Sequence, residues 1–285
     1  MASLKEIKIR LASIRNTQKI TSAMKMVSSA KLHHTQTIVE HMLAYESKLS
    51  VLLNGVLAAE SDLNSPYTAQ RKVKQVAIVA FSSSTGLCGA FNANIWKELS
   101  ARLHRYEADG IAVRLYPVGK KVADELYKAG YQTDDSFLLI ADKLKYEDAS
   151  QLATALMTLY TSGEADRVEL LYHHFKNMAE QILTEKIFLP VTLPERDPES
   201  FSANYILEPS SEHLLALLLP KVLHLHIYTT MLDNATAEHA ARMLAMQTAN
   251  DNANDLIQEL TLQYNKTRQQ AITNELLDIM GGAGQ

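Results

Sequence analysis

The residues best suited to chemistry lie between Phe81 and Asn92, in the segment FSSSTGLCGAFN. Hydroxyl residues, two glycines and the chain's only cysteine follow an apolar run, Val76 to Phe81, and precede a stretch with a helical pattern. Doubly wound sheets bind phosphate where the carboxyl end of a strand meets a helix. The segment could therefore hold a phosphate, present a nucleophile, or form only a tight turn.

The spacing of its glycines matches none of the motifs that such sites use. A P-loop requires Gly-Lys-Ser/Thr, and the chain contains no such triplet. Gly86 and Gly89 are too few for a dinucleotide fingerprint, and the Gly-Leu-Cys-Gly order differs from the Gly-x-Ser-x-Gly of a nucleophile elbow. Cys88 between apolar neighbours is more typical of a small buried side chain than of a nucleophile.

The histidines and acids form no catalytic or metal-binding pattern either. His33 and His34, like His173 and His174, are adjacent and would face different ways, and there is no His-Glu-x-x-His. We therefore expect no catalytic residue, no cofactor and no metal. The net charge of −4 does not suggest a nucleic-acid binder, and the single cysteine excludes an intrachain disulfide.

The most apolar window, LLALLLPKVLHLHI, is interrupted by Pro220 and Lys221. Its unbroken part is shorter than the roughly 18–20 residues that a membrane helix needs. The N-terminal segment is charged from Lys5 onward and lacks the apolar region of a signal peptide. These features predict a soluble or peripheral protein, cytoplasmic if bacterial.

Two long helices are predicted at the ends of the chain. Residues 1–54 contain neither glycine nor proline, and Ser3 with Glu6 forms a capping-box pattern, so we expect one helix of about 55 residues. Apolar residues follow coiled-coil intervals of three and four. Their positions are Leu4, Ile7, Leu11 and Ile14, and then Ile38, Met42, Tyr45, Leu49, Leu52 and Val56.

The second helix is expected from Lys221 to Met280, with Gly281 and Gly282 as its stop. Helices of this length need a packing partner, and we expect the two to pair as an antiparallel coiled coil. Residues 1–34 carry seven Lys/Arg and one Glu, whereas residues 233–285 carry seven Asp/Glu and three Lys/Arg, which favours the pairing. The alternative is two unrelated amphipathic helices packed on a globular core.

The middle of the chain alternates between strand and helix patterns, which predicts an α/β layer with a mostly parallel sheet. The last two strands have no helix between them and are expected to form a hairpin at one edge. The predicted domains are 1–65, 73–205 and 210–285. The expected strands are 73–81, 111–119, 136–140, 167–175 and 181–191, and the expected helices are 92–108, 120–130 and 146–163.

Four segments resemble the γ subunit of F-type ATP synthases, and together they span the chain. They are IRNTQKITSAMKMVSSAKL near the start, GLCGAFN in the middle, NYILEP before the last helix, and the segment from AARMLAMQT to MGGA at the end. Ser83-Ser84-Thr85 stands where many members of that family carry a charged pair.

The resemblance implies a rotor shaft. The two terminal helices would turn inside a ring of three α and three β subunits and couple proton or sodium flow through a c-ring to ATP synthesis or hydrolysis at β. The α/β domain would touch the ε subunit and the c-ring, with Tyr205 on that side. Catalysis would belong to β, and the chain would be a peripheral protein at the cytoplasmic face of a bacterial inner membrane. The positions that match β contacts are Met24, Lys25, Arg268, Gln269 and Thr273.

Two other functions remain open from the residues alone. A coiled coil can serve as a non-rotating adaptor or scaffold that docks other helices. The α/β domain could also be an enzyme that uses the turn at Phe81 to Asn92. Co-purification with α and β subunits would separate the first from the rotor, and nucleotide binding by the isolated chain would separate the second.

Overall fold

The computed structural model describes residues 3–59, 65–191 and 211–282. The chain divides into two compact units, Met1–Ala30 with Arg242–Gln285 and Lys31–Ala241, called here the coiled-coil unit and the sheet unit. Helices α1 (Leu4–Ala59) and α5 (Ser211–Gly282) each contribute to both units. The domain limits expected from the sequence therefore stay a prediction, because these units divide both long helices.

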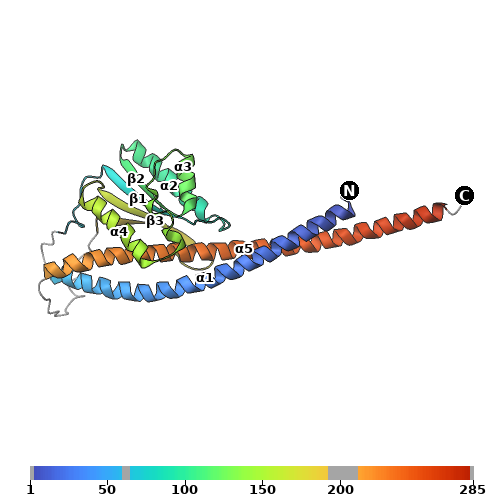
Figure 1. Cartoon of the computed structure of the whole chain (residues 1–285), viewed down its shortest axis with the longest axis horizontal. Coiled ribbons are helices and arrows are strands. Elements are labelled where there is room, and N and C mark those ends of the chain that lie inside the picture. Colours follow the sequence, from blue (N-terminus) through green and yellow to red (C-terminus); the bar gives the residue numbers. More distant parts are fainter. Residues whose placement is uncertain (1–2, 60–64, 192–210, 283–285) are drawn as a thin grey trace. The chain divides into compact units, whose positions relative to one another are not determined.

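The sheet unit contains four strands in the order β2-β1-β3-β4 (Figure 1). Strand β1 (Gln75–Phe81) is parallel to both β2 (Ala112–Val118) and β3 (Arg167–Phe175). Strand β4 (Gln181–Leu189) is antiparallel to β3 and forms the expected edge hairpin with it. The predicted fold class, long terminal helices with a central α/β domain and a mostly parallel sheet, is confirmed.

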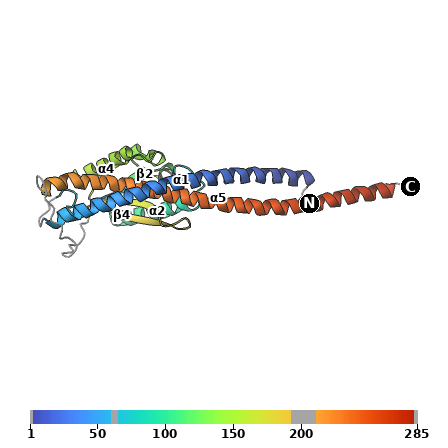
Figure 2. The ribbon, with the colours of Figure 1, turned by 90° about the horizontal axis from the view of Figure 1, so that it is seen from below.

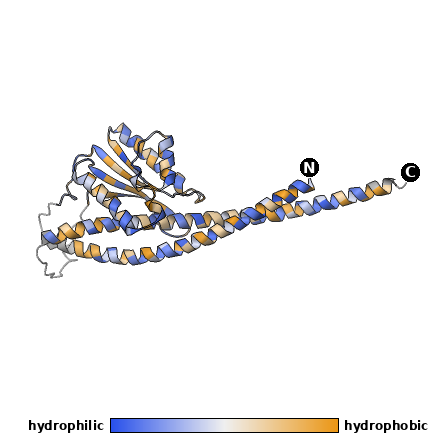
Figure 3. Ribbon diagram, viewed as in Figure 1, coloured by the Kyte–Doolittle hydropathy of each residue, from blue (hydrophilic) through white to orange (hydrophobic). Residues whose placement is uncertain are grey.

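Both faces of the sheet are buried, as the alternation of side chains along β1 shows. Val76, Ile78 and Ala80 pack with α2 (Phe91–Ala108) and α3 (Lys120–Lys128), whereas the residues between them pack with α4 (Tyr146–Thr161) and the first half of α5. A strand buried on both faces is continuously apolar, as β1 is from Val76 to Phe81, and Figure 3 shows the sheet in a mixture of the two colours. The sheet is therefore the middle layer of three.

The strand expected at residues 136–140 is wrong. Two short 3₁₀ helices, Asp135–Phe137 and Ile140–Asp142, occupy this region. Asp134 explains the difference, because its Oδ1 accepts hydrogen bonds from the backbone N–H of Ser136 at 3.0 Å and from its hydroxyl at 2.6 Å. Such local bonds give the backbone an alternative to a sheet ladder.

The start expected for the last helix is also wrong, since α5 begins at Ser211 and continues through Pro220. An apolar stripe at four-residue spacing holds this part of the helix against the core of the sheet unit. By length and composition alone α5 could cross a membrane, with an 18-residue window of mean hydropathy 1.4, but core helices of soluble proteins pass the same test. The buried stripe is Leu215, Leu219, Leu223, Ile227 and Met231.

The start of α1 is confirmed. The backbone N–H of Ser3 donates to Oε2 of Glu6 at 2.9 Å, and the backbone N–H of Glu6 donates to Oγ of Ser3 at 3.2 Å. These reciprocal bonds are the predicted capping box, and they satisfy two N–H groups that the first helical turn would otherwise leave free.

The buried positions of α1 recur at intervals of three and four residues, starting at Leu4. Part of the predicted set of buried positions is wrong. Met42 and Leu49 belong to this series, whereas Tyr45 and Leu52 are 53% and 41% exposed. The series of positions that is buried includes the polar residues Thr35 and Glu46, so apolar spacing alone favoured a neighbouring series on the helix. The side chain of Val56 lies outside the described residues. The buried members are Ile7, Thr21 and Ser28 in the coiled-coil unit, and Leu32, Thr35, Leu49 and Leu53 in the sheet unit.

Within the coiled-coil unit the helices pair in antiparallel register, and they lie side by side in Figure 2. The amide of Gln18 donates to Asn254, while Ile7 and Arg10 share a cavity with Leu260 and Gln263. On α5, Met246, Ala253 and Leu260 are buried at seven-residue intervals, the spacing of a coiled-coil seam.

Candidate functional site

The turn after β1 is closed by its own hydrogen bonds. The backbone N–H of Ser83 donates to Oδ1 of Asn92 at 3.1 Å, and Nδ2 of Asn92 donates to Oγ of Ser83 at 2.7 Å. Oγ of Ser82 accepts from the backbone N–H of Val122 at 3.1 Å, at the first turn of α3. These N–H groups bind protein oxygens rather than facing a ligand, which speaks against a phosphate cradle.

Cys88 is structural in this arrangement. It is 2% exposed and packs with Phe91, Ala237 and Ala241. Its Sγ lies 3.1 Å from Nδ2 of Asn92 and 3.7 Å from Oγ of Ser83. An amide and a hydroxyl cannot act as the general base that a nucleophilic cysteine requires, and the expected buried role is confirmed.

Histidines of the sheet unit are packed in different places. His174 contacts Asp233, with 2.7 Å between Nδ1 and Oδ2, and His224 contacts Oγ1 of Thr154 at 3.1 Å. Burial, with the charge of Lys186 as the second cause, lowers the pKa of His226 to about 4. Among residues 3–59, 65–191 and 211–282, no three His, Cys, Asp or Glu side chains are grouped so that they could hold a metal ion.

His173 is buried on the face of the sheet that carries α2. Its ring stacks on Phe91 with the centroids 4.2 Å apart, it is 1% exposed, and its Nδ1 has no hydrogen-bond partner. Burial lowers the pKa of His173 to about 4. The folded chain therefore holds this imidazole neutral.

We expect His173 to make the sheet unit sensitive to acid. The pKa of His173 is lower in the folded chain than in the unfolded chain. The contribution of the neutral ring to the free energy of unfolding is therefore fully present above about pH 6.5 and is lost as the pH falls through 4. At pH 4.5 the loss should be about 2–3 kcal/mol. Urea unfolding followed by the fluorescence of Trp96 measures it.

The variant His173→Phe keeps an aromatic ring and should lose less stability than the wild type between pH 8 and pH 4.5. His104→Phe is the control, because the His104 side chain is 70% exposed. Equal acid sensitivity of His173→Phe and wild type would show that His173 is not the source.

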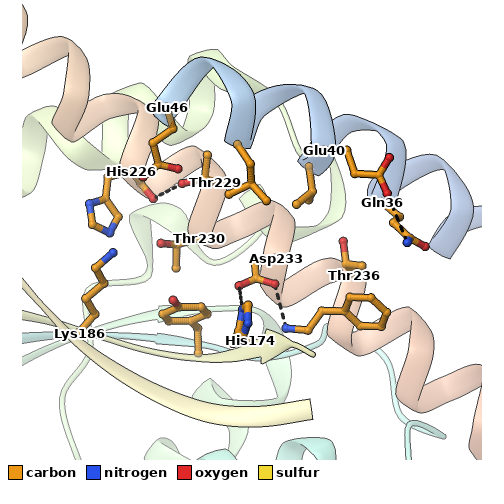
Figure 4. Close-up of a pocket in the computed structure, with 14 residues that line it drawn as sticks. Gln36, Glu40, Glu46, His174, Lys186, His226, Thr229, Thr230, Asp233 and Thr236 are labelled. Atoms are coloured by element: carbon orange, nitrogen blue, oxygen red, sulfur yellow. Dashed lines mark hydrogen bonds and ion pairs between the residues drawn. The ribbon is translucent and has the colours of Figure 1, made fainter. Parts of the chain in front are cut away.

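A cavity of about 360 Å³ lies within the sheet unit, between α1, the β3–β4 hairpin and α5 (Figure 4). Burial lowers the pKa of Lys186, with Glu46 and Asp233 acting in the opposite direction, and burial raises the pKa of Tyr172 to about 12. Asp233 is held by His174 and by the backbone N–H of Phe175. Among the residues that line this cavity, no nucleophile is hydrogen-bonded to an adjacent base.

The structure places the predicted β-contact residues on two separate parts of the coiled-coil unit. Met24 and Lys25 are half-buried on α1, while Arg268, Gln269 and Thr273 are exposed on α5. Since Ile7 lies beside Leu260, residues 268–273 lie at and beyond the N-terminal end of α1, roughly 35–45 Å from Met24 along the helices at 1.5 Å per residue. They do not form one site. Tyr205 lies outside the described residues.

The last turns of α5 expose an apolar surface that no described residue of the chain covers. Exposed apolar surface of this kind is a candidate for contact with another protein. The exposed fractions range from 48% to 74% at Ile272, Leu276, Leu277, Ile279 and Met280.

Comparison with known proteins accounts for these features. The sequence profile of a family described as ATP synthase matches residues 3–284. An ATP synthase gamma chain of Parabacteroides distasonis is 67% identical over 283 residues, which cover 99% of each chain. The chain belongs to the ATP synthase gamma chain family. The gamma chain of Flavobacterium johnsoniae is 43% identical over 284 residues, covering 99% of this chain and 98% of the relative.

Solved structures share the fold of this family. A chain of the Euglena gracilis mitochondrial ATP synthase matches with a TM-score of 0.63 at 20% identity, over 98% of this chain and 93% of its own length. A central-stalk and c-ring structure of Tetrahymena thermophila matches with a TM-score of 0.55 at 23% identity, over 81% and 99%. The resemblance seen in the sequence is confirmed at the level of family and fold.

Sequence reasoning missed Asp233 and Asn234, whose side chains bind the end of β3. Adjacent Asp and Asn have low helix propensity and favour bonds to nearby backbone. An adjacent Asp and Asn inside the alanine-containing helical stretch DNATAEHAA could have indicated that these two side chains bind a neighbouring backbone.

Proposed function

We propose that this chain is the central rotor shaft of an F-type ATP synthase. It turns inside a ring of α and β subunits and couples proton or sodium flow through a c-ring to ATP synthesis or hydrolysis at the β subunits. The observation that carries the proposal is the 67% identity to an ATP synthase gamma chain over 99% of both chains. The chain itself is non-catalytic, in keeping with the closed turn after β1 and a cavity without a nucleophile–base pair.

The partners follow from the same proposal. The coiled-coil unit faces β through Met24 and Lys25, and through Arg268, Gln269 and Thr273, and the apolar end of α5 is covered by the ring. The sheet unit contacts the ε subunit and the c-ring, with Tyr205 on that side. The similar solved structures of the Euglena gracilis mitochondrial ATP synthase contain an F1, a c-ring and a rotor, which supports these partners. The complex holds the chain at the cytoplasmic face of a bacterial inner membrane as a peripheral protein.

Such a shaft acts by differential contact. A ligand shifts a conformational equilibrium only to the extent that it binds the alternative states differently. A shaft with chemically different sides presents a different surface to each of three β subunits, so it biases three identical sites differently. Exposed polar residues such as Gln269 and Thr273 can exchange water for β contacts as the shaft moves on.

The test is a reversible covalent bond between shaft and ring. In a Cys88→Ala complex, Lys25→Cys is paired with a cysteine on the surface of β that faces it, and the disulfide requires Cα atoms roughly 4.4–6.8 Å apart. Oxidation should abolish ATPase turnover and reduction should restore it. Full activity in a quantitatively cross-linked complex would instead establish the non-rotating adaptor.

The matched control joins two residues of the same rotor. Gln18 and Asn254 are hydrogen-bonded within the coiled-coil unit, so a Gln18→Cys/Asn254→Cys pair can form a bond between helices that move together. Its oxidation should leave turnover unchanged. Loss of activity there would show that oxidation itself, rather than the shaft-to-ring bond, stops the enzyme.

A further inference from the structure

We propose that Asp233 and Asn234 form a clamp that fixes the sheet to α5 and carries torque between them. The proposal rests on the rotor function above and adds the residues through which the force passes. Both side chains belong to α5 within the sheet unit, and both bind backbone at the end of β3.

The clamp binds the part of β3 that has no paired strand on the β1 side. Strand β1 ends at Phe81, and its last pair with β3 joins Ala80 to Leu171, whereas β3 continues to Phe175 with only β4 beside it. Past Leu171, the N–H groups of β3 that point toward β1 have no strand to bind. Unpaired buried N–H groups are costly, so another element must supply acceptors.

Consecutive residues of α5 supply them. Oδ1 of Asn234 accepts from the backbone N–H of His173 at 3.1 Å, and Oδ1 of Asp233 accepts from that of Phe175 at 2.9 Å. The second oxygen of Asp233 lies 2.7 Å from Nδ1 of His174 (Figure 4). Three successive residues of the strand are therefore held by two successive residues of the helix.

The Asn234 half of the clamp is buried, whereas Asp233, whose side chain is 17% exposed, lines the 360 Å³ cavity. Asn234 is 3% exposed. Small buried residues next to it on α5 allow a close approach, and Ala237 and Ala241 pack with Cys88, Phe91 and Phe175. A hydrogen bond that water cannot reach resists displacement more than apolar contacts, which have no preferred direction.

The side of α1 is different. The 360 Å³ cavity lies between α1 residues Gln36 to Glu46, the hairpin and α5. Among the described residues of the sheet unit, no hydrogen bond or ion pair joins α1 to β3 or β4. The hydrogen bonds from the helices to the end of β3 therefore come from α5, whereas α1 contributes apolar packing through Leu53 and the charge of Glu46 near Lys186.

The experiment uses the reconstituted holoenzyme and compares ATP-driven ion pumping with ATP hydrolysis in the same vesicles. Asp233→Leu/Asn234→Leu removes both acceptors at similar volume. If the clamp carries torque, the ratio of pumping to hydrolysis should fall at least threefold in assembled complexes, while hydrolysis by the detached catalytic part stays near wild type. A structural role alone would lower both activities together with the yield of complex.

Conservative and matched variants make the result specific. Asn234→Asp and Asp233→Asn keep an acceptor for each backbone N–H and should retain at least half of the wild-type ratio. Gln36→Leu/Glu40→Leu changes two polar residues on the α1 side of the cavity and should leave the ratio unchanged. If the double leucine variant does not assemble, Asn234→Ala, which removes one acceptor, is measured in its place and should still lower the ratio.

An unchanged ratio in assembled double-leucine complexes, or in Asn234→Ala complexes where that variant replaces them, would overturn the clamp. It would leave the rotor function standing, because the Lys25 cross-link tests rotation in a chain with an intact clamp. Retained turnover in that cross-linked complex would overturn the rotor function whatever the clamp variants show.

Discussion

The variant Gly119→Ala is expected to lower the free energy of unfolding of the sheet unit by about 3–5 kcal/mol. Gly119 follows β2, at the point where the ends of β1 and β2 meet. Its φ of +103° is a conformation that side chains disfavour, and an added Cβ would overlap the carbonyl oxygen of Ser82. That carbonyl belongs to the backbone and cannot rotate away. Urea unfolding monitored by Trp96, which packs beside this core, measures the loss.

Gly110→Ala separates the two causes of this loss. Gly110 also has a positive φ, +66°, but nothing lies within 4 Å of the position of its Cβ. It should lose only about 1–2 kcal/mol, the cost of the left-handed conformation. Equal losses in the two variants would show that the contact with Ser82 relaxes and that conformation alone requires glycine at position 119.

The variant Arg102→Met is expected to cost about 3–5 kcal/mol, because it takes the nearest cation from the buried carboxylate of Glu169, which then keeps only Arg167 at 3.5 Å. On α2, the guanidinium of Arg102 lies 3.2 Å from Glu169 and 3.4 Å from Glu98, and it also contacts Glu185. Glu169 is only 3% exposed. Burial, with the hydrogen bond to Glu169 as the next cause, raises the pKa of Tyr106 to about 12. Removal of the arginine would leave three carboxylates around an apolar side chain.

The second change, Glu169→Leu, should restore most of this loss in the Arg102→Met background. Replacing a buried ion pair with apolar residues of similar volume is often neutral, whereas breaking the pair is not. Arg114→Met is the control, since Arg114 and Glu164 form a pair at 2.8 Å whose side chains are 51% and 54% exposed. That pair should contribute no more than about 1 kcal/mol. A double variant as unstable as Arg102→Met would show that packing, not charge, is lost.

The long helices and the sheet could be predicted because their signals are local. Residues 1–54 contain no glycine or proline, and β1 contains a continuous apolar run from Val76 to Phe81. The seam register could not be predicted from apolar spacing, since Thr35 is buried at 2% exposure while Tyr45 is 53% exposed. The face of α1 that is buried depends on how α5 packs against it, and the sequence of α1 alone does not specify that packing.

The candidate site was less predictable than the fold. Asp233 and Asn234 look like ordinary polar helix residues until it is known that the pairing of β3 with β1 stops at Leu171, four residues before β3 ends at Phe175. Pro220 likewise reads as a helix break, and only the burial of Leu215, Leu219 and Leu223 shows why α5 continues through it. Both features are consequences of long-range packing, which outweighs local preference.

The dependence of the sheet on α5 also constrains how the chain is made. The strands end at Leu189, but the helix that covers one face and binds the end of β3 supplies its contacts from Leu215 to Asn234. At about 5–20 residues per second, ribosomes take several seconds to synthesise that interval. During this time an apolar sheet face and unpaired strand groups are exposed on the nascent chain, so the sheet can reach its final form only after Asn234 has been added.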